Sequence, residues 1–218
     1  MSSVSYEAFF SNVMPEVPGC PEITAFNAIQ NAAIEFCEKS CILQVDHDPV
    51  TVLEKIVDYD LEPPTDFLVV KVMRAWLEGN ELTPVAPDVV DDPAIYNRLF
   101  TSYQAQPGTP RSFIQKDPRS VSLWPLPDKK YANGLTMRVA LKPTRAAETI
   151  DSLIYEDYYE AIAAGALARL LNSQGKPYSS RDGAAIADRQ FRQAINLARQ
   201  RATHGHNRST LSVQLRKI

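Results

Sequence analysis

Proline limits what this chain can fold into more than any other residue type. Twelve of the sixteen prolines fall between Pro49 and Pro143, and the segments on either side contain only four. Proline lacks a backbone N–H and breaks the interior of a helix, so long helices are excluded across this middle region. Its apolar runs and alternating segments predict strands over residues 50–59, 67–77, 81–85, 111–116, 120–124 and 135–142, with one or two helical turns over 91–99.

Two turns are expected between these strands. Gly79-Asn80 lies between two apolar runs and supplies the positive φ that a two-residue hairpin turn requires. Residues 128–134 separate the strand that ends before two prolines from the alternating run that follows. We therefore expect residues 120–143 to form a second hairpin.

The segments on either side of the middle region have a helical period instead. Apolar residues recur every three or four positions in four stripes, and each stripe predicts a helix with one buried face. The stripes are Tyr6, Phe9, Phe10, Val13 and Val17; Phe26, Ile29, Ala33, Phe36, Cys37 and Cys41; Tyr155, Tyr159, Ile162, Ala166 and Leu170; and Ala184, Ala187, Phe191, Ala194, Ala198 and Ala202. Small residues dominate the last stripe, so the last two helices can pack closely. Ser179 followed by Asp182 predicts the start of the last helix.

The order of these elements predicts the fold class. We expect an α+β protein in which a helical bundle, made of two N-terminal and two C-terminal helices, carries an all-β insertion and an extended C-terminal tail. The expected divisions are 1–45 for the N-terminal helices, 46–145 for the β-rich insertion, 146–205 for the C-terminal helices and 206–218 for the tail. The tail has too few apolar residues to fold alone.

Charge is divided unevenly along the chain. The net charge of the whole chain is −3, but residues 181–218 contain eight basic and two acidic residues, and the remainder carries −9. The overall balance argues against binding of nucleic acid by bulk attraction, and the basic arm leaves such binding open as an alternative. An odd number of cysteines favours a reducing compartment. We see no secretory signal and no apolar run near the roughly 20 residues of a membrane span, so we expect a soluble protein made in a cytoplasm.

No motif in the sequence indicates catalysis. The patterns of serine hydrolases, P-loops, dinucleotide-binding folds and zinc proteases do not occur. Cys37 and Cys41 are four residues apart with His47 close behind, but a zinc site takes three or four ligands, and both cysteines lie on the apolar stripe. His204 and His206 suit the carbonyl groups at a helix end. We expect no catalytic residue, no metal and no cofactor.

Carboxylates keep a hydrolase interpretation open. Glycoside hydrolysis needs only two placed carboxyl groups, and the chain offers candidates near Glu156 and at Asp58 and Asp60. The ordinary interpretation of Glu156 is a negative charge at the start of a helix, where it complements the helix dipole.

An aromatic platform is the other open interpretation. Trp124 and Tyr131, with Lys129 and Lys130 between them, could stack on a base or a sugar. A tryptophan that packs against a helical layer is the favoured alternative.

Three blocks of sequence resemble one known family. "MPEVPGCPEITAFNAIQNAAIEFCEKS" (14–40) is similar to the opening of the head-to-tail adaptor, or connector, proteins of tailed bacteriophages, which typically begin with a Pro-Gly-x-Pro turn and a helix carrying A-x-x-E-F-C. The stretch "VSLWPLPD…Y…LTMRVALKP" resembles the later strand pair of that family. "YEDYYEAIAAGALARLLNSQGKPYSS" (155–180) resembles the alanine-rich helix that follows, with its Gly-Lys-Pro-Tyr break.

The resemblance implies a structural virion protein at the neck of the particle. Such adaptors form a homo-oligomeric ring, commonly of twelve copies, beneath the portal protein and above a downstream tail or nozzle protein. Double-stranded DNA passes through the lumen, and the acidic body of this chain would not hold it specifically. The alternatives are another tail, baseplate or fibre-attachment ring component, or a virion-associated cell-wall hydrolase.

The resemblance also indicates which residues make contacts. The C-terminal segment of such adaptors often extends along the portal, and here it is basic with apolar residues near its end, so we predict that it docks by folding into a groove. The predicted portal-docking residues are Arg208, Leu211, Val213, Leu215, Arg216, Lys217 and Ile218. We predict that Trp124, Lys129, Lys130 and Tyr131 contact a neighbouring ring or tail component.

Overall fold

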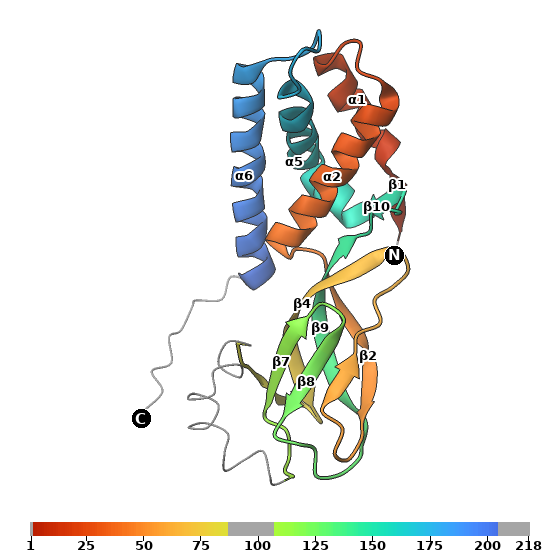
Figure 1. The fold of residues 1–218 in the computed structure, drawn as a ribbon, viewed down its shortest axis with the longest axis vertical. Helices are drawn as coiled ribbons and strands as arrows, with labels where there is room; N and C mark the ends of the chain where they lie inside the picture. The colour runs from red at the N-terminus through yellow and green to blue at the C-terminus, as the bar shows by residue number, and fades with distance from the viewer. Residues whose placement is uncertain (1, 87–106, 205–218) are drawn as a thin grey trace, which may run out of the picture. The chain divides into compact units, whose positions relative to one another are not determined.

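The computed structural model describes residues 2–86 and 107–204 and has the mixed α+β character expected from the sequence. Contacts within the chain divide it into two compact units (Figure 1). The helical unit contains Met1–Ile42 and Asp151–Ile218, and the β-rich unit contains Leu43–Ile150. The helical turns expected over residues 91–99 lie outside the described residues.

The N-terminal segment is helical but broken into three short pieces. These are η1 (Tyr6–Phe9), α1 (Phe10–Val13) and η2 (Met14–Glu16). The hydroxyl of Ser5 accepts a hydrogen bond from the backbone N–H of Glu7 and so caps the first piece. Of the five residues in the predicted stripe, all but Phe10 are completely buried.

The second predicted helix is α2 (Glu22–Ser40), which follows Pro21. It ends at Cys41, whose positive φ of 53° is the left-handed conformation common just after a helix. The backbone N–H of Cys41 donates to the carbonyl oxygen of Cys37 at 2.9 Å. Phe36 and Cys37 are completely buried, as their place on the apolar stripe predicts.

Two long helices complete the helical unit, α5 (Ser152–Leu171) and α6 (Arg181–His204). The carboxylate of Asp151 caps α5 by accepting from the N–H of Leu153 at 2.9 Å. The prediction that Ser179 caps α6 is wrong. Ser180 is the capping residue, because its hydroxyl is the one that reaches the N–H of Gly183, at 3.1 Å. Four residues of the predicted stripe on α6 are buried, namely Ala184, Ala187, Phe191 and Ala198, and Ile195 is buried with them. Ala194 and Ala202 are half-buried.

The core of the helical unit contains aromatic rings from all three long helices. The ring of Phe36 on α2 lies 4.9 Å from that of Tyr158 on α5 and 6.2 Å from that of Phe191 on α6, measured between centroids. Tyr158 has non-helical backbone angles (φ −131°, ψ 21°), so α5 is kinked at this position. Phe36 therefore contacts aromatic rings on both of the other long helices.

The β-rich unit contains two four-stranded sheets. The first has the order β2 (Gln44–Val52), β9 (Tyr131–Pro143), β4 (Phe67–Leu77) and β5 (Asn80–Glu81), with all neighbours antiparallel. The second has the order β3 (Asp58–Asp60), β8 (Ser120–Trp124), β7 (Ser112–Asp117) and β6 (Thr83–Pro84), the last pair being parallel. Two short strands, β1 (Ser3–Ser5) and β10 (Thr149–Asp151), form a two-stranded sheet.

The predicted hairpin over residues 120–143 is wrong. Strand β8 pairs with β3 and β7, whereas β9 pairs with β2 and β4, so the two strands belong to different sheets. Both edges of β9 are taken by longer partners, which leaves no edge for β8. Tyr131 also begins β9 instead of lying in a turn, and it is almost completely buried.

The single strand predicted over residues 50–59 is also wrong, because the chain changes sheet there. Strand β2 ends at Val52, and β3 begins at Asp58 in the other sheet. Lys55, in the connecting turn, has a positive φ of 61° that breaks the extended conformation. The hydroxyl of Tyr59 stabilises this turn by donating a hydrogen bond to the carbonyl oxygen of Ile56 at 2.8 Å.

The hairpin expected after residue 77 is present, but its turn is shifted by one residue. Leu77 pairs with Asn80, so the two turn residues are Glu78 and Gly79. Both have positive φ, 48° and 82°, as a two-residue hairpin turn requires.

Candidate functional site

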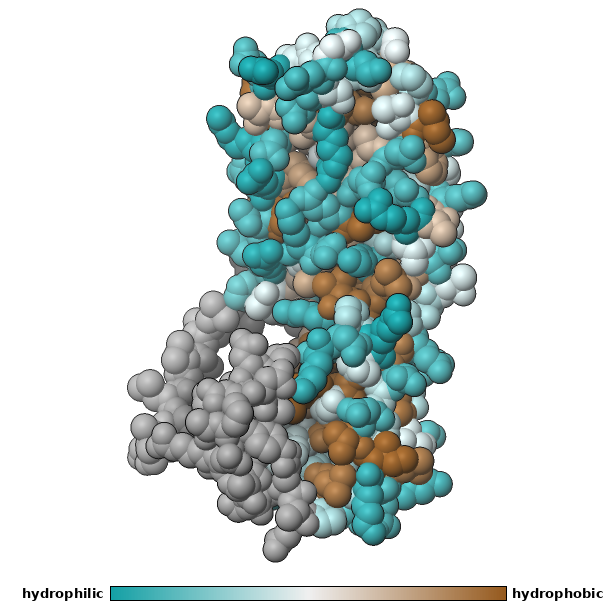
Figure 2. Space-filling model, in the orientation of Figure 1, coloured by the Kyte–Doolittle hydropathy of each residue, from teal (hydrophilic) through white to brown (hydrophobic). Residues whose placement is uncertain are grey.

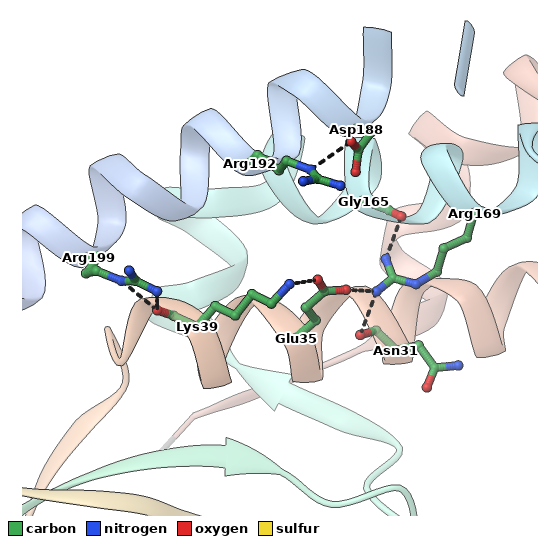
Figure 3. A network of polar contacts seen from close by, with 8 residues as sticks. All are labelled: Asn31, Glu35, Lys39, Gly165, Arg169, Asp188, Arg192 and Arg199. Carbon is green, nitrogen blue, oxygen red and sulfur yellow. Dashed lines mark hydrogen bonds and ion pairs between the residues drawn. The ribbon is translucent and has the colours of Figure 1, made fainter. Parts of the chain in front are cut away.

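Charged side chains join the three long helices of the helical unit (Figure 3). Glu35 on α2 lies between two cations, forming ion pairs with Lys39 on its own helix and with Arg169 on α5. Arg169 also donates to the carbonyl oxygens of Gly165 at 2.7 Å and of Asn31 at 3.5 Å. The guanidinium of Arg169 is therefore bonded both to α5, its own helix, and to α2.

The C-terminal end of α2 is bonded to α6 in a similar way. Arg199 donates to the carbonyl oxygen of Lys39 from Nε at 2.9 Å and from Nη2 at 2.7 Å. A cation suits this place because the last carbonyls of a helix carry partial negative charge. Figure 3 shows the chain of contacts running from Arg199 through Lys39 and Glu35 to Arg169.

The surroundings of Glu35 lower its pKa. Burial acts to raise the pKa, but the hydrogen bond from Lys39 and the charge of Arg169 outweigh it. Glu35 is therefore a charged structural group at neutral pH.

A cavity of about 460 Å³ opens beside this network. Glu35 and Arg169 line it together with Asp188 and Arg192, which pair with each other at 2.7 Å on α6. Four of the five charged side chains in the lining form two ion pairs, and the fifth is Arg181. We interpret the cavity as a product of helix packing.

A second hollow of about 590 Å³ lies between α5 and α6, and we call it the α5–α6 groove. Its lining includes three carboxylates, four alanine or leucine side chains, two tyrosines, one glutamine and one arginine. These are Glu156, Asp157, Glu160, Ala161, Ala164, Ala194, Leu197, Tyr158, Tyr159, Gln190 and Arg201. Leu197 is 55% exposed and contributes the largest aliphatic side chain of this lining.

The four residues predicted to contact a ring or tail component lie in or just before β9 and at the end of β8. Tyr131 is buried, and its hydroxyl donates to Asp128 at 2.6 Å. Lys129 is exposed and holds its ammonium 5.1 Å from the centroid of the Tyr131 ring, Lys130 is exposed, and Trp124 is half-buried. The surface here therefore consists of the two lysines and part of the tryptophan, and no aromatic platform of two exposed rings forms.

Exposed apolar side chains lie in a turn whose backbone is bonded to the segment just before these lysines. The backbone N–H of Lys55 donates to the carbonyl oxygen of Pro127 at 3.0 Å, which brings the turn after β2 against the segment before β9. Leu53 and Ile56 in that turn are 42% and 43% exposed. Figure 2 shows apolar residues gathered on the visible face of the β-rich unit.

The carboxylate candidates for hydrolysis form two separate groups, one in each unit. Asp58 and Asp60 are exposed on β3, and Asp58 accepts a hydrogen bond from the hydroxyl of Ser122 on β8 at 2.5 Å. Glu156 lies in the other unit, in the second turn of α5. It is not at the very start of the helix as expected.

The cysteines and His47 have structural roles. Cys37 is buried, Cys41 ends α2, and His47 Nε2 accepts from the N–H of Glu62 at 3.0 Å. Across residues 2–86 and 107–204, no three metal-ligating side chains come together, and no helix is long and apolar enough to cross a membrane. The predicted portal-docking residues, from Arg208 to Ile218, lie outside the described residues.

Sequence reasoning missed both the Glu35–Arg169 pair and the α5–α6 groove. The spacing of Glu35 and Lys39, four residues apart, was a readable signal for a local ion pair. The pairing with Arg169 joins segments 134 positions apart, and no local pattern in a single sequence indicates such a contact.

In this structure, the helical unit is joined by ion pairs, and the β-rich unit exposes apolar and basic residues. The chain belongs to the family of the SU10 adaptor protein, which it matches over residues 11–214. This is a family of phage head–tail adaptors, so the protein is a structural component of a phage virion. No curated protein matches the chain.

Proposed function

We propose that this protein is a head-to-tail adaptor that forms a ring of twelve copies under the portal. The family match over residues 11–214 carries this proposal. Under this proposal, the ring connects the capsid to the tail, and a downstream tail or nozzle protein binds on the side away from the portal. The helical bundle with its β-rich insertion would give each copy one stiff part for neighbours and portal and one part for the next component.

A closed ring requires two different surfaces on each copy, because each subunit contacts one neighbour with one patch and the next neighbour with another. The two units offer surfaces of opposite character. The helical unit carries the acidic α5–α6 groove, and the β-rich unit carries Lys129 and Lys130 beside the exposed Leu53 and Ile56. Residues Trp124, Lys129 and Lys130 are proposed to contact a neighbouring ring or tail component, with Tyr131 supporting them from the core.

The C-terminal segment is proposed to dock on the portal. Its sequence combines the basic residues Arg208, Arg216 and Lys217 with apolar residues at every second position near the end. Apolar side chains would fill pockets of the portal and the cations would meet its carboxylates. Leu215→Asp should therefore weaken docking much more than Ser212→Ala in the same segment.

DNA is proposed to pass through the ring without specific binding. Residues 1–180 carry a net charge of −9, and a surface of that sign repels phosphates. Adding DNA fragments to assembled rings at low salt should produce no stable complex, whereas a complex that dissociates steeply with salt would favour the DNA-binding alternative.

Sedimentation of the protein with purified portal rings of its own phage tests the main proposal. We expect the free protein to join the portal in a stoichiometric ring, and Leu215→Asp to remain in the free fraction. If the protein ignores the portal and instead assembles alone or binds fibres, it is a different tail or baseplate component.

A further inference from the structure

The α5–α6 groove has the dimensions of a binding site for a short extended peptide. Along α6 its lining runs from Gln190 to Arg201, a separation of eleven positions that corresponds to about 16 Å of helix. Its small side chains, Ala161 and Ala164 on α5 and Ala194 on α6, leave room for the side chains of an occupant. Leu197 adds an exposed apolar surface beside them.

The charge of the groove calls for a basic occupant. Glu156, Asp157 and Glu160 are all exposed along one side, and in the described part of the chain none of them forms an ion pair. Like charges four residues apart on a helix repel one another, so an added cation would relieve the repulsion between Glu156 and Glu160. Arg201 in the lining faces Tyr158 instead, with its Cζ 5.9 Å from the centre of that ring.

We propose that the α5–α6 groove binds residues 206–218 of the same chain before the protein assembles. Leu211, Val213 and Leu215 occupy every second position, so an extended conformation places all three on one face. They would span about 14 Å, which matches the length of the groove. Arg208 on one side and Arg216-Lys217 on the other supply the cations that the carboxylates lack.

The connection between the helix and this segment favours the same chain over a second copy. The described part of α6 ends at His204, less than one turn beyond Arg201 at the end of the groove. Gly205 follows directly, and glycine tolerates the conformations needed to reverse the chain. A segment tethered this closely has an effective concentration in the millimolar range, well above that of protein free in solution.

Occupation of the groove would make the C-terminal segment a latch. If the segment also docks on the portal, as the proposed function states, the same residues cannot fill both sites. Free copies would then hold the segment in the groove and release it when a portal offers better contacts. The binding to the groove itself does not depend on that function.

Disulfide trapping in the full-length protein tests the groove directly. In a Cys41→Ser background we would combine Ala161→Cys in the groove with Val213→Cys in the segment. The matched control combines Gln193→Cys, exposed on α6 and outside the groove lining, with the same Val213→Cys. Under mild oxidation, we expect the groove pair to form a monomeric disulfide about tenfold faster than the control pair.

Two further variants link the disulfide to the proposed contacts. Leu215→Asp and the triple change Glu156→Gln, Asp157→Asn, Glu160→Gln should each slow the groove disulfide several-fold while leaving the thermal melting curve unchanged. Equal rates for the groove and control pairs, or no effect of these variants, would overturn the proposal. A covalent dimer from the groove pair would also overturn it, in favour of a neighbouring copy as the occupant.

The portal result is independent of this experiment. If the monomeric disulfide forms but the protein does not bind portal rings, the groove proposal is supported and the proposed function is contradicted. If the protein binds portal rings but the groove disulfide does not form, the proposed function is supported and the groove proposal is contradicted.

Discussion

The ring of Phe191 on α6 lies directly against the backbone of Gly165 on α5. A Cβ added to Gly165 would stand 2.6 Å from Cε2, 2.7 Å from Cδ2 and 2.9 Å from Cζ of that ring. The two helices can approach this closely because position 165 has no side chain. Three alanines on α6, Ala184, Ala187 and Ala198, are also buried.

Gly165→Ala should destabilise the helical unit. Alanine favours a helix by up to about 1 kcal/mol over glycine, but a Cβ overlapping three ring atoms forces the helices apart, and overpacking of this kind costs about 1–3 kcal/mol. Urea denaturation followed by circular dichroism measures the net effect. In a Phe191→Leu background the same change should cost less than half as much, and a stabilised Gly165→Ala single variant would contradict the contact.

Arg169→Met should lower the free energy of unfolding by about 1–3 kcal/mol, because it leaves the carboxylate of Glu35 and the carbonyl oxygen of Gly165 without a major partner. The methionine keeps most of the packing volume. Lys39→Met is the matched control, since it removes an exposed pair on the same helix that is worth only about 0.5 kcal/mol. Equal costs for the two variants would show that Arg169 has no special role in joining α2 and α5.

The low pKa of Glu35 predicts a dependence of stability on pH. Since the folded pKa lies below the unfolded value, near 4.3 for glutamate, the contribution of Glu35 is fully present above that value and disappears as the pH falls through the folded pKa. Glu35→Gln should therefore be less stable than the parent at pH 7, with a smaller difference at pH 3. Denaturation of both proteins at the two pH values checks this, and a difference that stays constant would contradict it.

Thiol labelling should distinguish the three cysteines. Burial, with smaller contributions from Asp151 and Cys41, raises the pKa of the Cys37 thiol to about 12, and Cys20 is also buried. Cys41 is the most accessible of the three. Iodoacetamide at pH 8 should add one label to the native protein and three after denaturation, as mass spectrometry can count. Cys41→Ser should take up no label while native, and rapid labelling of Cys37 would refute its burial.

The turn between β4 and β5 should respond oppositely to two changes. Gly79→Ala adds a Cβ that meets no atom within 4 Å, so its expected cost of about 1 kcal/mol comes from the positive φ alone. Glu78→Asn should stabilise the turn by a few tenths of a kcal/mol, because asparagine adopts positive φ more readily and Asn-Gly suits this turn. Thermal melts of both variants test the assignment. If the turn were centred on Gly79-Asn80, Glu78→Asn would bring no gain.

Local patterns in the sequence were sufficient to find individual elements. The strands over 67–77 and 120–124 appear with the predicted bounds, because apolar residues there are bracketed by turn residues or prolines. The helix stripes identified most buried residues, since burial of one helix face repeats every three or four residues. On α5, however, Tyr158 is buried, whereas the predicted Tyr155 and Tyr159 are half-buried. Burial of Phe36 and Cys37 on α2 follows directly from that period.

Pairing between strands could not be predicted in this way. The run from Ser120 to Pro143 contains two strands and a suitable turn, but β9 has better partners in β2 and β4, which are far away in the sequence. The choice depends on which edges other strands leave free, and local residues do not record it. The α5–α6 groove was missed for a related reason, because its two sides belong to helices that are separately well formed.

The β-rich unit has a further consequence for how such proteins diversify. It is one continuous stretch, Leu43–Ile150, and its incoming strand β2 starts beside the last part of β9, with the N–H of Leu141 donating to the carbonyl oxygen of Leu43 at 2.8 Å. The aromatic contact of Phe36, Tyr158 and Phe191 and the ion pairs of Glu35 lie wholly outside this stretch. A recombination event that replaced codons 43–148 with those of another adaptor would exchange nearly all of the β-rich unit in one step. The codons of the helical core and of β10, which pairs with β1, would be unchanged.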